Sequence, residues 1–200
     1  MTWFYRVFRN PVVFLTVLWT RMRRIGRENI PAEGGAVLVC NHLSMWDMIT
    51  VACMTRRYVC FVGKSELEKN PLVRFFVRQV KAICVDRGKP DLGAIRRMLA
   101  MVKQGELLLI FPEGTRNRHP ESQPLLPLQE GTAMVALRGG VPAIPLWICG
   151  KYNPWRGLRV AVGKPIDLDE FRQDRRPDLE LATKRIEEAL LSLREETMAG

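Results

Sequence analysis

Short apolar runs alternate with longer stretches of helical periodicity through most of this 200-residue chain. An apolar run bounded by polar turns predicts a strand, and apolar side chains repeated every three or four positions predict a helix. The predicted strands span residues 36–40, 58–62, 82–85, 107–111, 143–148 and 158–162. The predicted helices span residues 44–54, 71–80, 92–103, 131–138 and 178–194. This alternation predicts a single α/β domain in which helices flank a central, largely parallel or mixed sheet.

The N-terminal segment follows a helical pattern of its own. Asn10 is expected to cap a helix that has Pro11 at its first position, where proline is tolerated. The apolar stretch from Pro11 to Trp19 is too short to cross a bilayer, which takes about 20 residues. No small-residue cleavage site follows it, so we do not expect a signal peptide. The apolar positions of the pattern are Phe4, Phe8, Pro11, Leu15, Leu18, Met22 and Ile25.

Charge adds to this picture because it is unevenly distributed. Lys and Arg number 31 against 21 Asp and Glu, which gives a net charge of +10. The first 27 residues contain six arginines and no acidic residue, and aromatic residues that favour a lipid headgroup boundary flank the apolar stripe. We therefore predict an amphipathic membrane-associating segment over residues 1–27, lying in the interface of an anionic membrane, and a folded domain over residues 28–200. The residues concerned are Arg6, Arg9, Arg21, Arg23, Arg24, Arg27, Trp3, Tyr5 and Trp19.

Two other interpretations of this segment stay open. It is also compatible with an ordinary helix docked on the domain core, or with a solvated basic arm. We expect no nucleic-acid partner.

The five cysteines show neither a C-x-x-C pair nor a zinc-binding spacing. Most of them lie in apolar runs, as buried free thiols do. We therefore expect no metal site and a location on the reducing, cytoplasmic face of the cell membrane, where the protein would be peripheral or monotopic. The cysteines are Cys40, Cys53, Cys60, Cys84 and Cys149.

A first polar cluster, Asn41 to Asp47, follows the first predicted strand of the domain. His42 and Asp47 are five residues apart, so neither a regular helix nor a strand would bring their side chains together. Ser44 and Asp47 form a capping-box-like pattern, which predicts a bend from loop to helix between them. After such a bend a carboxylate can hold an imidazole as a general base. The alternative is that Asp47 only caps the helix and His42 is an ordinary loop residue.

A second polar cluster, Phe111 to Arg116, follows the fourth predicted strand. Its first four residues suit a type I turn with Pro112 at the second position and Gly114 at the fourth. Such a turn can present backbone N–H groups to an anion, and Arg116 adds a forked donor suited to phosphate. Glu113, itself an anion, is expected to orient an arginine or to accept from a substrate hydroxyl. The alternative is a surface turn with an exposed ion pair.

Together these runs resemble the 1-acyl-sn-glycerol-3-phosphate acyltransferase family, the lysophospholipid acyltransferases. The family pattern N-H-x-S-x-x-D matches Asn41 to Asp47, and F-P-E-G-T-R matches Phe111 to Arg116 in full. Two further blocks also match, and the resemblance covers about residues 28–165. These blocks are Gly63-Lys64-Ser65-Glu66-Leu67 with Cys84-Val85-Asp86-Arg87-Gly88, and Val141-Pro142-Ala143-Ile144-Pro145.

The resemblance implies transfer of an acyl group from acyl-CoA or acyl-carrier protein to the free hydroxyl of a lysophosphatidate-like acceptor, giving phosphatidate. It implies that His42 deprotonates this hydroxyl with the support of Asp47, without a covalent acyl-enzyme, and that no cofactor is needed. It places Arg87 and the turn from Glu113 to Arg116 near the acceptor phosphate. The substrate-binding residues expected on this basis are Asn41, Ser44, Lys64, Arg87, Glu113, Gly114, Thr115 and Arg116.

This sequence departs from the family pattern at two places, and several alternatives stay open. Asn117 stands where the family often has Ser, and Glu130 stands where a Lys is common, which weakens a phosphate-binding role there. Cys40 or Ser44 is a formal alternative as a covalent nucleophile. The acceptor is alternatively another lysolipid or a glycolipid. The other functions are a thioester or lipid hydrolase and a non-enzymatic membrane-binding module.

Overall fold

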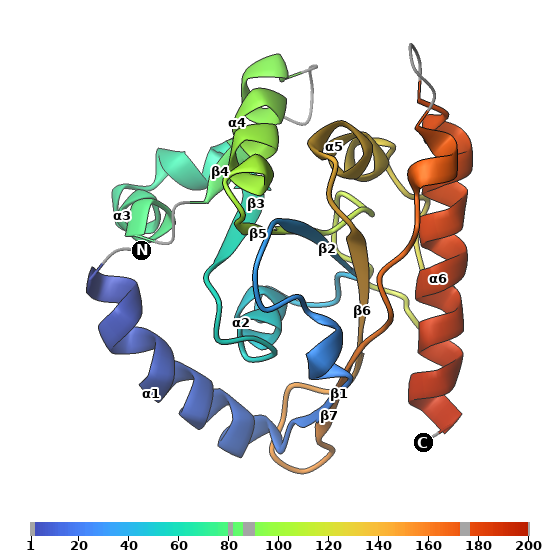
Figure 1. Ribbon diagram of the computed structural model, residues 1–200. Coiled ribbons are helices and arrows are strands. Elements are labelled where there is room, and N and C mark those ends of the chain that lie inside the picture. The colour runs from blue at the N-terminus through green and yellow to red at the C-terminus, as the bar shows by residue number, and fades with distance from the viewer. Residues whose placement is uncertain (1–2, 80–81, 86–90, 173–176, 200) are drawn as a thin grey trace.

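A seven-stranded sheet forms the centre of the protein, in the strand order β1-β7-β6-β2-β5-β3-β4 (Figure 1). The computed structural model describes residues 3–79, 82–85, 91–172 and 177–199. Among the described strands every neighbouring pair is parallel except β6 and β7, which run antiparallel. The strands are β1 (Arg23–Ile25), β2 (Ala36–Cys40), β3 (Val59–Lys64), β4 (Ile83–Val85), β5 (Leu107–Ile110), β6 (Ala143–Gly150) and β7 (Leu158–Val162).

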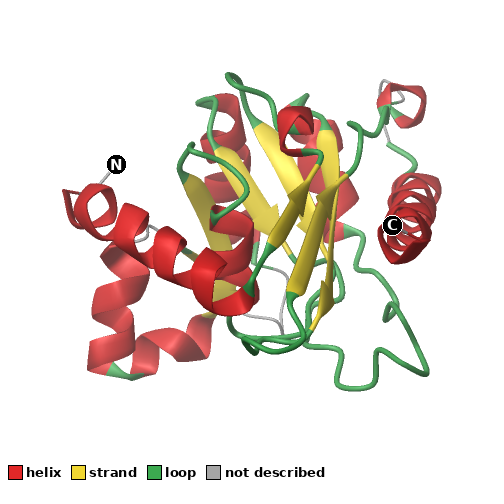
Figure 2. Cartoon of the chain, turned by 90° about the horizontal axis from the view of Figure 1, so that it is seen from below, coloured by secondary structure: helices red, strands yellow, loops and turns green. Residues whose placement is uncertain are grey.

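Helices cover both faces of the sheet, as Figure 2 shows from below. Alternate side chains of a central strand enter two different cores: Val37 and Val39 of β2 pack in one, and Leu38 and Cys40 in the other. The first core lies under α4, α5 and α6, and the second lies under α2, with α1 at its edge. The α-helices are α1 (Trp3–Thr20), α2 (Asp47–Ala52), α3 (Pro71–Gln79), α4 (Leu92–Lys103), α5 (Gly131–Gly139) and α6 (Leu179–Ala199). The short 3-10 helices are η1 (Arg27–Asn29), η2 (Ser65–Lys69) and η3 (Asp169–Phe171).

The predicted fold class is confirmed: this is an α/β domain with a mostly parallel sheet between helices. The predicted bounds of β2, β7 and α4 are those observed, because each is a clear apolar pattern ended by turn residues. Most other elements differ by one to three residues at their ends. Val80, the last residue of one predicted helix, lies outside the described residues.

The N-terminal helix differs from its prediction at both ends. It begins at Trp3 and carries Pro11 inside, so Asn10 is not its cap. It ends at Thr20, although the apolar pattern continued to Ile25. Arg21 takes a left-handed φ of 48°, and the N–H of Met22 donates to the carbonyl of Val17 at 3.1 Å. This is the closing bond of a Schellman turn, which is normally made with glycine and was therefore not visible in the sequence.

The residues after this turn were not predicted to form a strand. Arg23–Ile25 pairs in parallel with β7 and forms one edge of the sheet, so the end of the basic segment is part of the sheet. Three exposed residues carry no apolar strand signal of their own, and only the neighbouring strand defines them. Within the part of the chain that the structure describes, no helix combines the length and apolar character needed to cross a membrane.

Candidate active site

The two polar clusters meet at one edge of the sheet. His42 follows β2 by two residues, and Phe111 directly follows β5. Because β2 and β5 are adjacent and parallel, their carboxyl ends lie side by side. This edge is where open α/β sheets place their ligand sites. The topology alone therefore brings together two motifs that lie about 70 residues apart in the chain.

His42 and Asp47 are in contact, as the predicted bend requires. The Nδ1 atom of His42 lies 2.8 Å from Oδ2 of Asp47. The ring of His42 also stacks on Phe111, with centroids 4.0 Å apart and planes inclined by 15°. With Nδ1 engaged by the carboxylate, Nε2 is the ring nitrogen left to accept a proton. The side chain of His42 keeps 13% of its surface exposed, whereas that of Asp47 has none.

The bend is made by Asp47 more than by Ser44. Oδ2 of Asp47 accepts from the backbone N–H groups of Leu43 at 2.6 Å and Ser44 at 2.8 Å, so the carboxylate holds the loop as well as the imidazole. The helix begins at Asp47 and not at Ser44. The side chain of its N-cap residue, Trp46, makes no capping hydrogen bond. The hydroxyl of Ser44 accepts instead from the N–H of Trp46 at 3.3 Å. Asp47 therefore both shapes the turn and orients His42.

Tyr152, which the sequence interpretation did not include, completes the surroundings of Asp47. Its hydroxyl donates to Oδ1 of Asp47 at 2.5 Å and lies 3.1 Å from the hydroxyl of Thr50. Burial raises the pKa of Tyr152 far above its usual range, and the negative charge of Asp47 adds to this effect. Tyr152 therefore stays neutral and donates. Both oxygens of Asp47 are thus bonded, which fixes the direction of the carboxylate.

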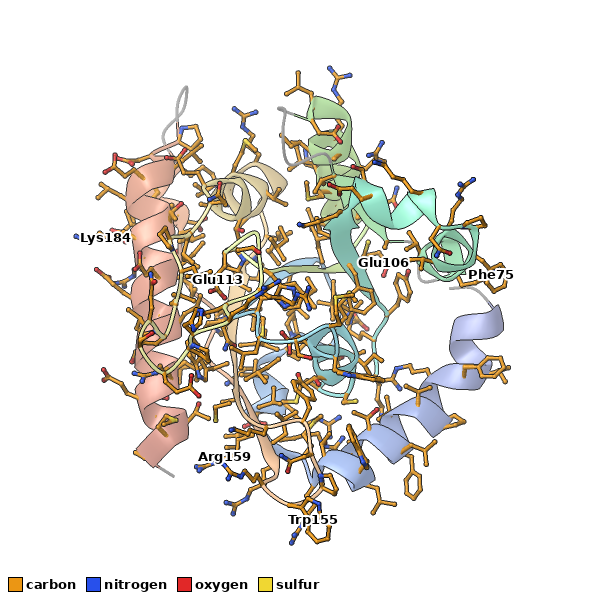
Figure 3. All side chains as sticks on the ribbon, turned by 180° about the vertical axis from the view of Figure 1, so that it is seen from behind. Phe75, Glu106, Glu113, Trp155, Arg159 and Lys184 are labelled. Atoms are coloured by element: carbon orange, nitrogen blue, oxygen red, sulfur yellow. The ribbon has the colours of Figure 1, made fainter. Side chains whose placement is uncertain are left out.

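Glu113 accepts hydrogen bonds from the backbone of two different loops. It is buried, with 5% of its surface exposed. Figure 3 labels it among the side chains in the middle of the molecule. Its Oε1 accepts from the backbone N–H of His42 at 2.7 Å, and its Oε2 accepts from the N–H of Leu126 at 3.0 Å. Burial raises the pKa of Glu113, against the effect of these two hydrogen bonds. Glu113 therefore ties the turn after β5 to the loop of His42, and among the described residues it pairs with no arginine.

The rest of the second motif forms the predicted turn. The N–H of Gly114 donates to the carbonyl of Phe111 at 3.1 Å, and Gly114 takes a positive φ of 68°, which favours glycine. Thr115 and Arg116 are exposed on this turn. Lys64 is exposed at the carboxyl end of β3, which neighbours β5, so it lies at the same edge of the sheet. Arg87 lies outside the described residues.

Two asparagines hold the loop from the inside. Asn41 is 1% exposed, and both ends of its amide bond the backbone of Ile148 on β6, at 2.8 and 3.0 Å. This predicted substrate-binding side chain thus fixes the end of β2 to β6. Asn117, also buried, donates its N–H to the carbonyl of His42 at 2.7 Å. Long-range bonds of this kind leave no local signal in the sequence.

An apolar cavity of about 450 Å³ opens beside the turn. It extends between the sheet and helices α4 and α5. Phe111, which stacks on His42, forms part of its wall, as do Glu113 and Gly114. The cavity is thus separated from the imidazole by one aromatic ring. Its other apolar walls come from Val62, Val85, Ile95, Met98, Ile110 and Met134.

The alternative nucleophiles are poorly placed for covalent chemistry. Cys40 is fully buried, and its burial, with the nearby charges of Asp47 and Glu113, raises the pKa of its thiol well above the usual range. A buried, protonated thiol is inert toward thioesters. The hydroxyl of Ser44 accepts from the N–H of Trp46 and, among the described residues, makes no hydrogen bond with the imidazole of His42. The arrangement is therefore suited to moving a proton to and from His42.

Comparison with known proteins gives consistent results. Residues 21–149, more than half of the chain, match the family model described as Acyltransferase. The chain is 30% identical over 173 residues to the 1-acyl-sn-glycerol-3-phosphate acyltransferase of Bacillus subtilis, and the match covers 84% of each protein. It is 27% identical over 206 residues to the enzyme of the same name from Streptococcus pneumoniae, covering 97% of this chain and 74% of that relative.

The fold is also similar to a solved structure. The crystal structure of the 1-acyl-sn-glycerophosphate acyltransferase PlsC from Thermotoga maritima matches with a TM-score of 0.72 at 24% identity. The match covers 95% of this chain and 80% of that protein. At this level of identity the similarity concerns the fold.

Proposed function

This chain belongs to the acyltransferase family, and from that premise we propose that it makes phosphatidate from 1-acylglycerol-3-phosphate. In the proposed reaction a fatty acyl group moves from a thioester, acyl-CoA or acyl-carrier protein, to the free hydroxyl of the acceptor. The observation that carries the proposal is the contact of His42 with Asp47 at 2.8 Å, beside a turn that carries an exposed arginine. The names of the relatives support this choice of acceptor.

The chemistry follows from the free nitrogen of His42. Nε2 takes the proton of the acceptor hydroxyl while the hydroxyl oxygen attacks the thioester carbonyl, and Asp47 stabilises the imidazolium that forms. When the tetrahedral intermediate collapses, the carbon–sulfur bond breaks and the leaving thiolate takes the proton from His42. The acyl group goes directly to the acceptor, and no residue of the chain is acylated. The burial of Cys40 supports direct transfer.

The acceptor phosphate is expected on the turn after β5. Arg116 is exposed there and can bind two phosphate oxygens with its planar guanidinium, while Thr115 adds a hydroxyl. Lys64 supplies a further cation at the same edge of the sheet. Arg87 is expected to act with them, on the family pattern alone. The apolar cavity behind Phe111 suits a fatty acyl chain, because it is walled by apolar side chains and begins next to the reacting groups.

The exposed side of α1 supports membrane association. This helix packs Val13 and Val17 toward the core but leaves larger apolar side chains in solvent, for example Phe14 at 67% and Leu18 at 64% exposed. Trp155, 87% exposed, projects from the loop that passes the end of α1 (Figure 3). An apolar patch of this kind marks an interaction surface. The protein is therefore proposed to lie peripherally on the cytoplasmic face of an anionic membrane, through the segment of residues 1–27.

A thiol-release assay tests the reaction. Wild type should release thiol from acyl-CoA only when lysophosphatidate is present, and His42→Ala should lower the rate by about 10²- to 10⁴-fold. The matched control is His119→Ala, because the imidazole of His119 is exposed on the following loop and should leave the rate unchanged. Thiol release without acceptor would indicate a hydrolase. Full activity with other lysolipids or glycolipids, and none with lysophosphatidate, would reject the proposed acceptor.

A further inference from the structure

Four arginines gather at the far end of α2 from Asp47. Arg9 comes from α1, Arg24 from β1, Arg27 from the 3-10 helix after it, and Arg56 from the loop that follows α2. They line one hollow of about 360 Å³. These residues belong to parts of the chain that are up to 47 positions apart, so the cluster is a product of folding and was not visible as a motif.

Three of the four arginines donate to backbone carbonyls where α2 ends. Arg9 donates to the carbonyls of Ala52, at 3.2 Å, and Thr55. Arg24 donates to the carbonyl of Cys53 at 3.3 Å. These bonds satisfy carbonyls that a helix end leaves without partners. Arg27 likewise donates to the carbonyl of Met54 at 2.9 Å.

The carbonyls do not neutralise the charge. Among the described residues the ion pairs are His42 with Asp47 and Arg172 with Asp169, so none involves this cluster. The pKa of Arg27 is lowered by burial and then by the charges of Arg24, Arg56 and Arg9. Neighbouring cations thus repel one another here without a carboxylate between them. A helix end offers only about half an elementary charge in compensation.

Part of this donor capacity is unused. The Nε atom of Arg9 is buried and has no hydrogen-bond partner among the described residues. The exposed side chain of Arg56 makes no hydrogen bond to the described residues, and Arg24 is exposed as well. A buried donor without a partner is costly unless something outside the chain binds it. The hollow is therefore short of an anionic acceptor.

The other wall of the hollow indicates where that acceptor comes from. Val13, Phe14 and Val17 of α1 line it together with the arginines. Phe14 also belongs to the exposed apolar side of α1, which is proposed to enter the membrane. A group held here would therefore have its charged part among guanidinium groups and its apolar part along the helix. An anionic phospholipid has this distribution, and a free inorganic anion does not.

We propose that the hollow lined by Arg9, Arg24, Arg27 and Arg56 binds the phosphate of an anionic phospholipid headgroup, at a site separate from the catalytic one. Guanidinium groups bind phosphate oxygens through paired hydrogen bonds. The site lies at the opposite end of α2 from Asp47, and its lining includes no residue of the His42 loop or of the turn after β5, so we assign it to a membrane lipid and not to the acceptor. The inference rests on the proposed membrane association, which it makes specific for charge.

Vesicle sedimentation with the full chain tests this site. The vesicles are phosphatidylcholine alone, and phosphatidylcholine with about one fifth phosphatidylglycerol, which adds surface charge. Arg56→Gln is the first variant because the Arg56 side chain makes no hydrogen bond or ion pair within the part of the chain that the structure describes. Its binding to the anionic vesicles should be about fivefold weaker than that of wild type, the factor that corresponds to about 1 kcal/mol per arginine. Arg24→Gln/Arg56→Gln should be weaker again.

Lys184→Gln is the matched control. Lys184 is exposed on α6, on the opposite side of the molecule from α1 (Figures 1 and 3). Lys184→Gln removes one positive charge, as Arg56→Gln does, but far from the hollow. It should therefore leave binding to both kinds of vesicle unchanged. An equal loss for Lys184→Gln and Arg56→Gln would overturn the site in favour of general charge attraction. Unchanged binding of Arg56→Gln would also overturn it.

Two further measurements separate this site from its surroundings. Binding to phosphatidylcholine alone reports the apolar side of α1, and turnover of detergent-dispersed lysophosphatidate reports the active site. Arg56→Gln should keep the wild-type level of phosphatidylcholine binding and of turnover. If wild type itself showed no binding to phosphatidylcholine or no turnover, the proposed function would fail and not the arginine site. Inorganic phosphate, at constant ionic strength, tests the soluble source. If it raised the melting temperature of wild type but not of Arg56→Gln, while anionic vesicles bound both equally, the lipid would be rejected in favour of free phosphate.

Discussion

The two ends of α2 hold charge in opposite ways. At its first residue, Asp47 is fully buried and accepts from an imidazole, two backbone N–H groups and a tyrosine hydroxyl. Beyond its last residue, Arg9, Arg24 and Arg27 donate to carbonyl groups, and Arg56 lines the same hollow. Among the described residues none of the four arginines pairs with a carboxylate. The helix between them spans only six residues, or about 9 Å.

The difference indicates two kinds of task. A group that must hold another in one orientation needs all its hydrogen bonds within the fold, because a loose partner loses the geometry of proton transfer. A group that binds a partner from outside needs charge left over after folding. Substitutions at the Asp47 end of α2 should therefore alter kcat, and substitutions at the arginine end should alter binding to anionic vesicles.

The largest effect is expected from Asp47→Asn. The amide can keep one oxygen toward His42, Leu43 and Ser44 but cannot stabilise an imidazolium. We expect kcat to fall by about 10²- to 10⁴-fold. Asp169→Asn is the control, since that carboxylate is 76% exposed in a surface pair and should leave kcat unchanged. A near-normal kcat for Asp47→Asn would remove the carboxylate from the mechanism.

Glu113→Gln should mainly affect stability. The amide can accept from only one of the two N–H groups now bonded, those of His42 and Leu126, so one is left unpaired. We expect the free energy of unfolding to fall by about 1–3 kcal/mol, measured by urea denaturation. Glu121→Gln, an exposed change in the next loop, should have almost no effect.

The effect of Glu113 also depends on pH, with a defined sign. Its pKa is raised on folding, so the folded state binds the proton more tightly than the unfolded chain. Its stabilising contribution is therefore complete below the ordinary glutamate pKa of about 4.3 and is lost as pH rises through the folded pKa. The difference in the free energy of unfolding between wild type and Glu113→Gln should therefore narrow as pH rises from the ordinary glutamate pKa through the folded pKa. A difference that widens there would contradict the assigned direction.

Tyr152→Phe should have a smaller effect on the rate. It removes one hydrogen bond to the Asp47 carboxylate, a loss of about tenfold in kcat with little change in KM. Because Tyr152 acts through Asp47, its effect should largely disappear when both residues are replaced, which a double-mutant cycle measures. Additive losses in the double variant would assign Tyr152 a separate role, for example in substrate contact.

The smallest effect distinguishes the two ends of α2 by salt. The fivefold difference between Arg56→Gln and wild type on anionic vesicles should vanish at about 1 M salt, where screening acts over about 3 Å. The deficit in kcat of Asp47→Asn should persist there, because a buried pair is screened much less. Equal salt sensitivity of both would mean that the two ends of α2 do not differ in kind.

The sequence predicted best what is decided locally. The apolar patterns of β2, β7 and α4 gave their bounds, and Ser44 and Asp47 indicated that the chain bends after His42. The hydrogen bonds that hold this bend were not predicted, because the carboxylate of Asp47, and not the hydroxyl of Ser44, accepts from the backbone N–H groups of the loop. The contacts of Tyr152 were missed because they join residues about 100 positions apart, and only the order of the strands brings them together.

The turn at Arg21 also sets how the enzyme would move on a surface. Only Arg21 and Met22 separate α1 from β1, and Met22 is buried. The connection is therefore a short, rigid turn and not a flexible linker. If α1 lies along a membrane, as proposed, the sheet would be held in one orientation above it, with the catalytic residues at one height. The encounter with lipid acceptors would then be a search in two dimensions, in which the molecule has only to diffuse laterally and to rotate about the membrane normal.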